Sequence, residues 1–150
     1  MSIITLKELA KTKGPLLGID PGSKTFGIAV SDLTRLIASP IETIKRKKFT
    51  KDAQQIFAHF DDKECSAIVI GYPVNMDGSE GPRTQSVKDF ATNLLGVRDI
   101  PIVFWDERLS TAAVTRTLLT ADTSRAKRAE SVDKLAATYL LQGLLDRLRT

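Results

Sequence analysis

The sequence predicts an α/β protein in which a mixed β-sheet carries helices on both faces. The first observation is that three extended segments lie close together near the start of the chain, at Leu16–Asp20, Phe26–Ser31 and Ile37–Ile44. The second is that apolar runs then alternate with amphipathic segments, in the overall order β-β-β-α-β-α-β-α-α. Three antiparallel strands followed by strand–helix alternation combine antiparallel and parallel pairing, which defines a mixed sheet.

Turn residues and apolar runs define each strand. The first two extended segments are separated only by the turn-forming run Pro21–Thr25, so we expect an antiparallel hairpin. The third segment contains Pro40, which favours an edge strand because proline cannot donate a ladder hydrogen bond. Ala67–Ile70 and Ile102–Trp105 are fully apolar, as expected for strands buried inside a sheet.

Apolar residues at helical spacing predict four helices. We expect Thr50 to cap the first helix and Ser110 or Thr111 to cap the third. The polar runs Gly71–Arg83 and Thr120–Ser131 are expected to be loops. The apolar stripes of the first, second and last helices are Ala53, Ile56, Phe57 and Phe60; Val87, Phe90, Ala91, Leu94 and Leu95; and Val132, Leu135, Ala136, Tyr139, Leu140 and Gly143.

Length and composition narrow the class of protein. The 150 residues fit one domain, which we place at 16–150 after a flexible or short-helical N-terminal arm at 1–15. No apolar run is long enough to span a bilayer and no signal-peptide core is present, so we expect a cytoplasmic protein without membrane contact. One cysteine and one histidine allow neither an internal disulfide nor a usual zinc site.

The net charge of +4 is mildly basic, and the placement of the charge says more than its total. A run of basic residues follows the third strand. Such clusters can converge on a phosphate backbone, although each can equally be a solvated face of the protein. The residues of this run are Lys45, Arg46, Lys47 and Lys48.

Acidic residues stand where an open α/β sheet binds ligands, at the carboxyl ends of buried strands. Asp20 ends the first strand, Asp106 and Glu107 follow the last, and Asp133 lies near the start of the last helix. Converging carboxylates need a cation, and Mg²⁺ or Mn²⁺ prefers oxygen ligands. Two such ions can support hydrolysis of a phosphodiester. Each acid also has a structural alternative, as a turn former, an ion-pair partner or a helix-start charge.

Four segments of the chain resemble the YqgF/RuvX family of RuvC-like Holliday junction resolvases and pre-16S rRNA nucleases. They occur in the family's order and span Leu16 to Leu145. A departure is Pro21, where the family often carries a residue such as valine; the change falls within a turn. The matching segments are GIDPGSKTFGIAVSD at Gly18–Asp32, GYPVNMDG at Gly71–Gly78, DERLST at Asp106–Thr111 and DKLAA at Asp133–Ala137.

The resemblance implies an RNase H-like fold and a metal-dependent nuclease. It implies Asp20, Glu107 and Asp133 as the catalytic acids and ligands of Mg²⁺ or Mn²⁺. We prefer Glu107 to Asp106 as the second acid. Neighbouring strand residues face opposite sides of a sheet, and the sequence alone leaves open which of the two faces Asp20. The expected partner is nucleic acid, either pre-16S rRNA in ribosome biogenesis or branched DNA. A resolvase that cuts a two-fold junction symmetrically would also need a homodimer.

Several further residues are candidates for contact with the substrate, each with a structural alternative. The hairpin-turn residues Lys24 and Thr25 could contact phosphate, as could Arg108, which could instead pair with Glu107. The loop at Gly71–Arg83 could close over substrate with Asn75 and Arg83 on the backbone.

Other polar or reactive side chains are weaker candidates. Asp32 is either an accessory acid or a strand terminator. We expect His59 and Cys65 to be structural, and Trp105 to be a core residue.

Two other classes of function compete with the nuclease. A nucleotide-binding ATPase could use the Asp20-Pro21-Gly22 hairpin on phosphate, but such proteins need two domains, and the Walker A motif is absent. A non-catalytic RNA- or ribosome-binding module could keep the fold without the activity. Clustered carboxylates argue against a pure phosphate binder, because they would repel its ligand.

Overall fold

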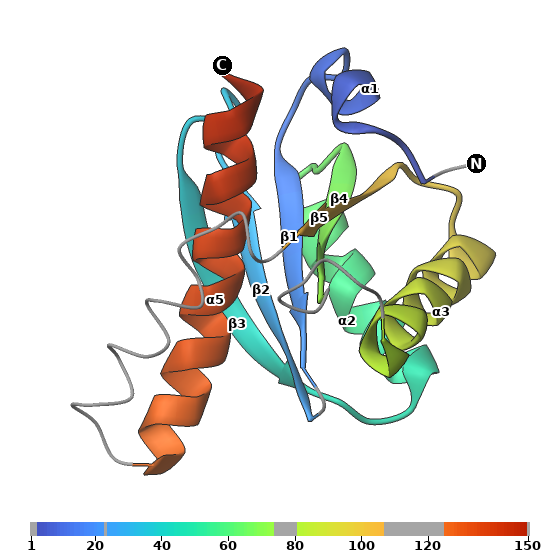
Figure 1. The fold of residues 1–150 in the computed structure, drawn as a ribbon, viewed down its shortest axis with the longest axis vertical. Coiled ribbons are helices and arrows are strands. Elements are labelled where there is room, and N and C mark those ends of the chain that lie inside the picture. Colours follow the sequence, from blue (N-terminus) through green and yellow to red (C-terminus); the bar gives the residue numbers. More distant parts are fainter. Residues whose placement is uncertain (1–2, 23, 74–80, 107–124, 150) are drawn as a thin grey trace.

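The structure is a computed structural model that describes residues 3–22, 24–73, 81–106 and 125–149, with the backbone alone described at 125–134. Within these ranges five strands form one mixed sheet in the order β3-β2-β1-β4-β5 (Figure 1). The strands are β1 (Leu16–Pro21), β2 (Thr25–Ser31), β3 (Ala38–Lys45), β4 (Ala67–Tyr72) and β5 (Ile102–Asp106). The helices are α1 (Leu6–Ala10), α2 (Phe49–Asp62), α3 (Pro82–Val97) and α5 (Arg125–Leu148).

The pairing confirms the mixed sheet that the sequence predicts. Strands β1, β2 and β3 pair antiparallel in succession, while β4 lies parallel to both β1 and β5. The strand that contains Pro40 is at the edge of the sheet, and its register shifts beside that residue. It follows from these directions that β1, β3, β4 and β5 all end at the same edge of the sheet. We call this the carboxyl edge.

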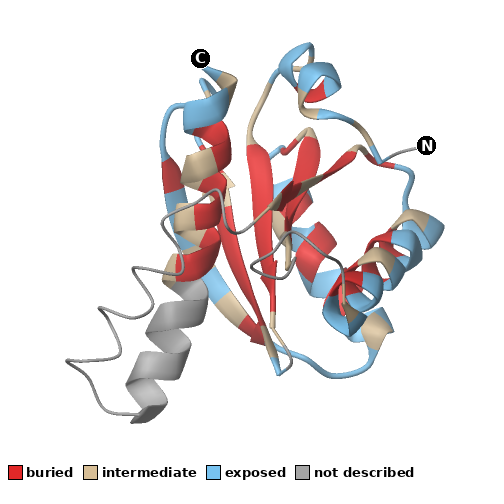
Figure 2. Cartoon of the chain, in the orientation of Figure 1, coloured by how far each residue is buried: buried red, intermediate tan, exposed pale blue. Residues whose placement is uncertain are grey.

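Helices cover both faces of the sheet, as predicted. Helices α2 and α3 pack on one face, where Phe57, Phe60 and Phe90 join a core with Ile19 and Ile28. Helix α5 packs on the other face (Figure 1). Strand β1 is buried from end to end between the two helical layers (Figure 2). Elements that are far apart in the sequence therefore pack around one central strand, β1.

Several predicted boundaries are wrong. The segment Gly71–Arg83, expected to be a loop, overlaps the end of β4 at Tyr72 and the start of α3 at Pro82. Side-chain chemistry explains two further differences. Helix α2 begins at Phe49 with Lys48 as its N-cap, so Thr50 is not the cap. Instead the buried carboxylate of Asp52 accepts the Lys47 backbone N–H at 3.1 and 3.2 Å. Helix α5 begins at Arg125, inside the segment expected to be a loop. Its first residues are polar, but arginine, alanine, lysine and glutamate are strong helix formers.

The segment before β1 adopts the short helix that was one of the two expectations for it. Leu9 of α1 is fully buried, and the Ile4 N–H donates to the Ile102 carbonyl at 2.8 Å. The Arg35 guanidinium donates to the carbonyls of Leu9 and Gly14 at 3.0 and 2.7 Å. These contacts join the segment before β1 to β5 and to the turn between β2 and β3. The helix expected to follow Ser110 or Thr111 lies outside the described residues.

A glycine on β1 lets α5 approach the sheet closely. A Cβ atom built on Gly18 would lie 3.1 Å from the Leu141 Cβ and 3.3 Å from its Cδ2. Leu141 is fully buried, and the small residues Ala136 and Ala137 of the same helix are buried as well.

None of the described helices is long and apolar enough to cross a membrane.

We predict that Gly18→Ala destabilises the protein by about 1–3 kcal/mol, because the added methyl group forces α5 away from β1. Gly96→Ala is the matched control, since a Cβ at Gly96 of α3 meets nothing within 4 Å. The control should stabilise by up to about 1 kcal/mol, through the higher helix propensity of alanine. Urea unfolding followed by circular dichroism measures both. Equal stabilities for Gly18→Ala and the parent would contradict the close approach.

Candidate nucleic-acid interface at the carboxyl edge

Asp20 is the acid that the structure places most clearly. It lies on β1 just before the last residue of the strand, and its side chain is 5% exposed. Leu17 and Ile19 belong to the core on the α2 and α3 face, while Leu16 and Gly18 face α5. Alternation along the strand therefore places the Asp20 carboxylate on the α5 face of the carboxyl edge.

Trp105 lies in the same lateral row as Asp20. Ile19 pairs with Ile70 and Gly71 pairs with Trp105, so Gly71, which has no side chain, separates Asp20 from Trp105. Trp105 packs in the core on the α5 face, as expected from the sequence. Its buried indole N–H has no hydrogen-bond partner among the described residues. The row thus contains a buried carboxylate and a buried hydrogen-bond donor.

The turn after Asp20 is narrow. The Gly22 N–H donates to the Thr25 carbonyl at 2.8 Å. A Cβ atom on Gly22 would lie 2.8 Å from that same oxygen, so only glycine fits without a shift of the backbone. This turn holds Lys24, whose side chain is exposed, and leads into Thr25 at the start of β2.

Basic residues from three elements gather around this turn. Thr25 pairs with Lys45 at the end of β3, and the Arg46 N–H donates to the Lys24 carbonyl at 2.9 Å. Lys47 and Lys48 follow with exposed side chains. Arg83 reaches the turn from the first residues of α3. The fold thus brings Arg83 to the turn that holds Lys24, although the two residues are 59 positions apart in the sequence.

Three of the predicted site residues, Asn75, Glu107 and Arg108, lie outside the described residues. Asp133 lies in α5, whose first part begins at the same end of the molecule as the β1–β2 turn (Figure 1), but its side chain is not described.

Asp106, the alternative to Glu107, lies at the end of β5. Trp105 faces α5, and Phe104 packs on the opposite face against Tyr72, with 5.0 Å between ring centroids. Alternation along β5 therefore places Asp106 on the face opposite to Asp20. This supports the preference for Glu107, which remains a prediction.

Three other candidate functional residues have contacts or burial that fit a structural role. Asp32 accepts the backbone N–H groups of Leu36 and Ile37 at 2.7 and 2.9 Å and also contacts the Thr34 hydroxyl, so it closes the turn after β2. His59 of α2 pairs with Glu42 of β3. Burial raises the pKa of the Cys65 thiol to about 11, which makes it a poor nucleophile.

The described donor set fits part of a site for a hard divalent cation. A nearly buried carboxylate at a strand end is a ligand that Mg²⁺ and Mn²⁺ accept. No group of three acidic, histidine or cysteine side chains forms a cluster within the described ranges. Asp20 therefore needs the acids expected beside it, Glu107 and Asp133, to complete a site.

The sheet order and the two helical layers define the class of the fold as RNase H-like. The fold resembles that of Thermus thermophilus RuvC in complex with a Holliday junction substrate, with a TM-score of 0.57, 14% identity and coverage of 91% of this chain and 97% of that one. It also resembles the yeast mitochondrial Holliday junction resolvase Ydc2, with a TM-score of 0.51, 12% identity and coverage of 96% and 85%.

The particular family follows from the sequence. The family model RuvX, described as Holliday junction resolvase, matches residues 14–147, so the chain belongs to the RuvX family. A relative from Paramagnetospirillum magneticum is 62% identical over 87% of this chain and 84% of its own length. Another, from Beijerinckia indica, is 54% identical over 99% of this chain and 90% of its own length. Both carry the name "Putative pre-16S rRNA nuclease".

We predict that Asp32 contributes to acid-sensitive stability and not to catalysis. Hydrogen bonds from Ile37 and Thr34 lower the pKa of its carboxyl group from 3.8 to about 2. Because the folded-state pKa is depressed, the contribution is complete above pH 3.8 and is lost as the pH falls towards 2. Asp32→Ala should therefore unfold at lower urea concentration than the parent at pH 6, with a smaller difference at pH 3. A pH-independent difference, or a large loss of nuclease activity in the folded variant, would contradict this role.

Proposed function

We propose that the protein is a metal-dependent nuclease that hydrolyses phosphodiester bonds in structured nucleic acid, with pre-16S rRNA as its physiological substrate. The observation that carries the proposal is the juxtaposition at the carboxyl edge. A nearly buried carboxylate, Asp20, ends the central strand, and basic residues surround the turn that follows it. The names of the relatives support the choice of pre-16S rRNA, and the family assignment supports the chemistry.

The catalytic acids of the proposed enzyme are Asp20, Glu107 and Asp133. These residues would hold Mg²⁺ or Mn²⁺, in a site of the two-metal-ion type. When bound, such ions lower the pKa of a coordinated water and stabilise the charge that develops on the leaving oxygen. The role of Asp20 is to supply a fixed, largely desolvated carboxylate, whose orientation is set by the pairing of β1 on both sides.

The basic residues have a different task, which is to attract and position the substrate backbone. Lys24, Lys45, Lys47 and Lys48 have exposed side chains at one edge, where they raise the local concentration of a polyanion. In the proposed complex they offset the repulsion between the acidic site and the phosphates. Thr25, Asn75 and Arg108 are proposed to contact the same backbone.

A second candidate substrate is a four-way DNA junction. The RuvX description and the RuvC neighbour, which was solved with a Holliday junction, favour it. Paired symmetric cuts in a junction would require a homodimer. For either substrate we propose that the protein acts in the cytoplasm.

We predict that Asp20→Asn abolishes cleavage while the protein stays folded, because the change removes a ligand charge and keeps the shape of the side chain. The loss should exceed the roughly 100-fold cost of altering a residue that only supports a metal ligand. End-labelled precursor rRNA and a four-way DNA junction are incubated with Mg²⁺, with Mn²⁺ and with EDTA, and near-UV circular dichroism verifies the fold.

Asp106→Asn is the matched control, since Asp106 lies on the opposite face of the sheet and should be dispensable, whereas Glu107→Gln should behave like Asp20→Asn. Cleavage of the RNA alone supports the rRNA nuclease, and paired nicks in the junction support the resolvase. Metal-dependent turnover by folded Asp20→Asn would refute the assignment. Metal-independent binding without any cutting would instead indicate a non-catalytic RNA-binding module.

A further inference from the structure

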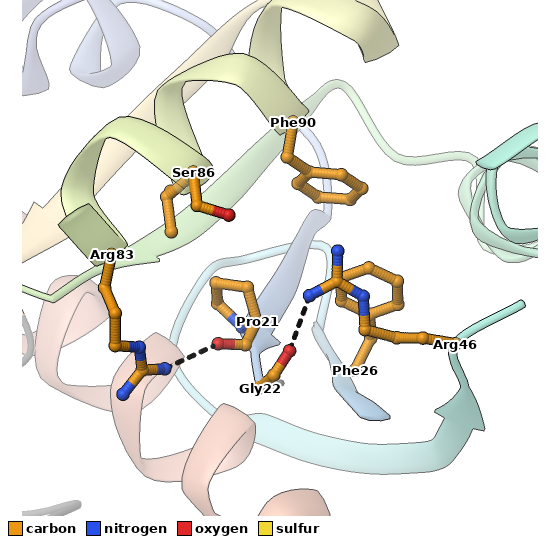
Figure 3. Close-up of a pocket in the computed structure, with 8 residues that line it drawn as sticks. Pro21, Gly22, Phe26, Arg46, Arg83, Ser86 and Phe90 are labelled. Carbon is orange, nitrogen blue, oxygen red and sulfur yellow. Dashed lines mark hydrogen bonds between the residues drawn. The ribbon is translucent and has the colours of Figure 1, made fainter. Parts of the chain in front are cut away.

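A pocket of ≈ 180 Å³ lies beside the β1–β2 turn, on the face of the sheet that α2 and α3 cover. Apolar side chains of β2 and α3 form part of its lining, namely Phe26, Val87 and Phe90. Two arginines stand on opposite sides of the turn and direct their guanidinium groups towards it (Figure 3). The pocket therefore combines an apolar wall with two cationic groups.

Arg46 is held in place before any ligand arrives. Its guanidinium carbon lies 4.6 Å from the centroid of the Phe26 ring, and its Nη1 donates to the Gly22 carbonyl at 2.7 Å. The Phe26 ring is itself stacked on Phe90, with 4.8 Å between the centroids. Because one face of Phe26 meets Phe90 and Arg46 covers the ring as well, the pocket offers little stacking surface to a nucleic-acid base. It instead presents a preorganised cation.

Arg83 approaches from α3, where its Nη2 donates to the Pro21 carbonyl at 3.2 Å. The two acceptor carbonyls belong to consecutive residues, Pro21 and Gly22, so both guanidinium groups are fixed to one short piece of backbone. Each guanidinium has five N–H donors. Neither of them forms an ion pair with an acidic side chain in the described part of the chain.

We propose that Arg46 and Arg83 form a phosphate clamp, which binds one internal backbone phosphate of the substrate strand next to the bond that is cut. The inference rests on the proposed nuclease function. Planar guanidinium groups match the oxygens of a phosphate, and the positive end of the α3 dipole lies nearby. Asp20 faces α5, whereas the clamp lies on the α3 side of the adjoining residues. The bound strand therefore crosses the carboxyl edge over the β1–β2 turn.

The clamp has a measurable signature in binding. Arg83→Gln and Arg46→Gln should each weaken the binding of a fluorescein-labelled single-stranded precursor rRNA fragment on the order of 10-fold. Each should also reduce the slope of log binding constant against log salt concentration by about one, which corresponds to the loss of one phosphate contact. Fluorescence anisotropy in EDTA measures both without cleavage. In Mg²⁺ the same variants should raise KM and leave kcat nearly unchanged, because the clamped phosphate is not the one that reacts.

Matched variants distinguish the loss of the clamp from a general loss of positive charge and from a loss of stability. Lys13→Gln removes one exposed positive charge from the segment before β1, away from the turn, and should change affinity far less. Arg83→Lys keeps the charge without the planar fork and should recover only part of the affinity. Thermal unfolding verifies that each variant is folded. Arg83 supplies the decisive variant, because its side chain is exposed and does not stack on the core as Arg46 does.

Replacing one phosphate at a time by a neutral methylphosphonate locates the clamped position. We expect one internal replacement to weaken binding to the parent protein and to have no further effect on Arg83→Gln. Equal losses at every position, or unchanged binding by folded Arg83→Gln, would overturn the clamp. A loss confined to 5′-phosphorylated RNA would overturn the internal assignment in favour of a terminal phosphate. The binding assay in EDTA keeps the two proposals distinct. Binding that depends on Arg46 and Arg83 in EDTA, together with no cleavage in Mg²⁺ or Mn²⁺, would refute only the nuclease.

Discussion

The burial of β1 on both faces is the constraint on which the rest of the structure depends. The strand pairs with β2 on one side and β4 on the other, and helical layers cover it above and below. Its alternation decides which residues meet α2 and α3 and which meet α5. A shift by one residue would exchange the faces of Gly18 and Ile19 and turn Asp20 away from α5. Core packing and the direction of the candidate catalytic carboxylate are therefore set by the same register.

The same register separates two kinds of chemistry at one edge of the sheet. Asp20 carries negative charge into the α5 side, where metal ligands are expected, and the next two residues offer carbonyls that hold two arginines on the α3 side. A polyanionic strand is repelled by the first side and attracted by the second. The short turn between them, which Gly22 makes possible, brings the two sides within reach of one substrate strand.

Much of this architecture could be predicted from the sequence, because apolar runs and turn residues report local structure directly. The hairpin, the edge strand with Pro40 and the buried interior strand at Ala67–Ile70 are examples. The start of α5 could not be predicted in this way. Its first residues are polar and basic, and a prediction that relies on the spacing of apolar residues assigns such a run to a loop. Arg46 and Arg83 are each candidates for contact with the substrate backbone, but their pairing could not be foreseen, because it depends on both side chains meeting consecutive carbonyls across the fold.

The central claim is that the carboxylate at the end of β1 holds a divalent cation. The most direct measurement is the anomalous diffraction of Mn²⁺ in crystals of the protein and of Asp20→Asn. The account predicts a peak within roughly 2.5 Å of an Asp20 carboxylate oxygen, as expected for a directly coordinated hard cation. It also predicts that the peak is lost in the variant. A saturating concentration of Mn²⁺ that leaves Asp20 uncoordinated, or a peak that persists unchanged in Asp20→Asn, would contradict it.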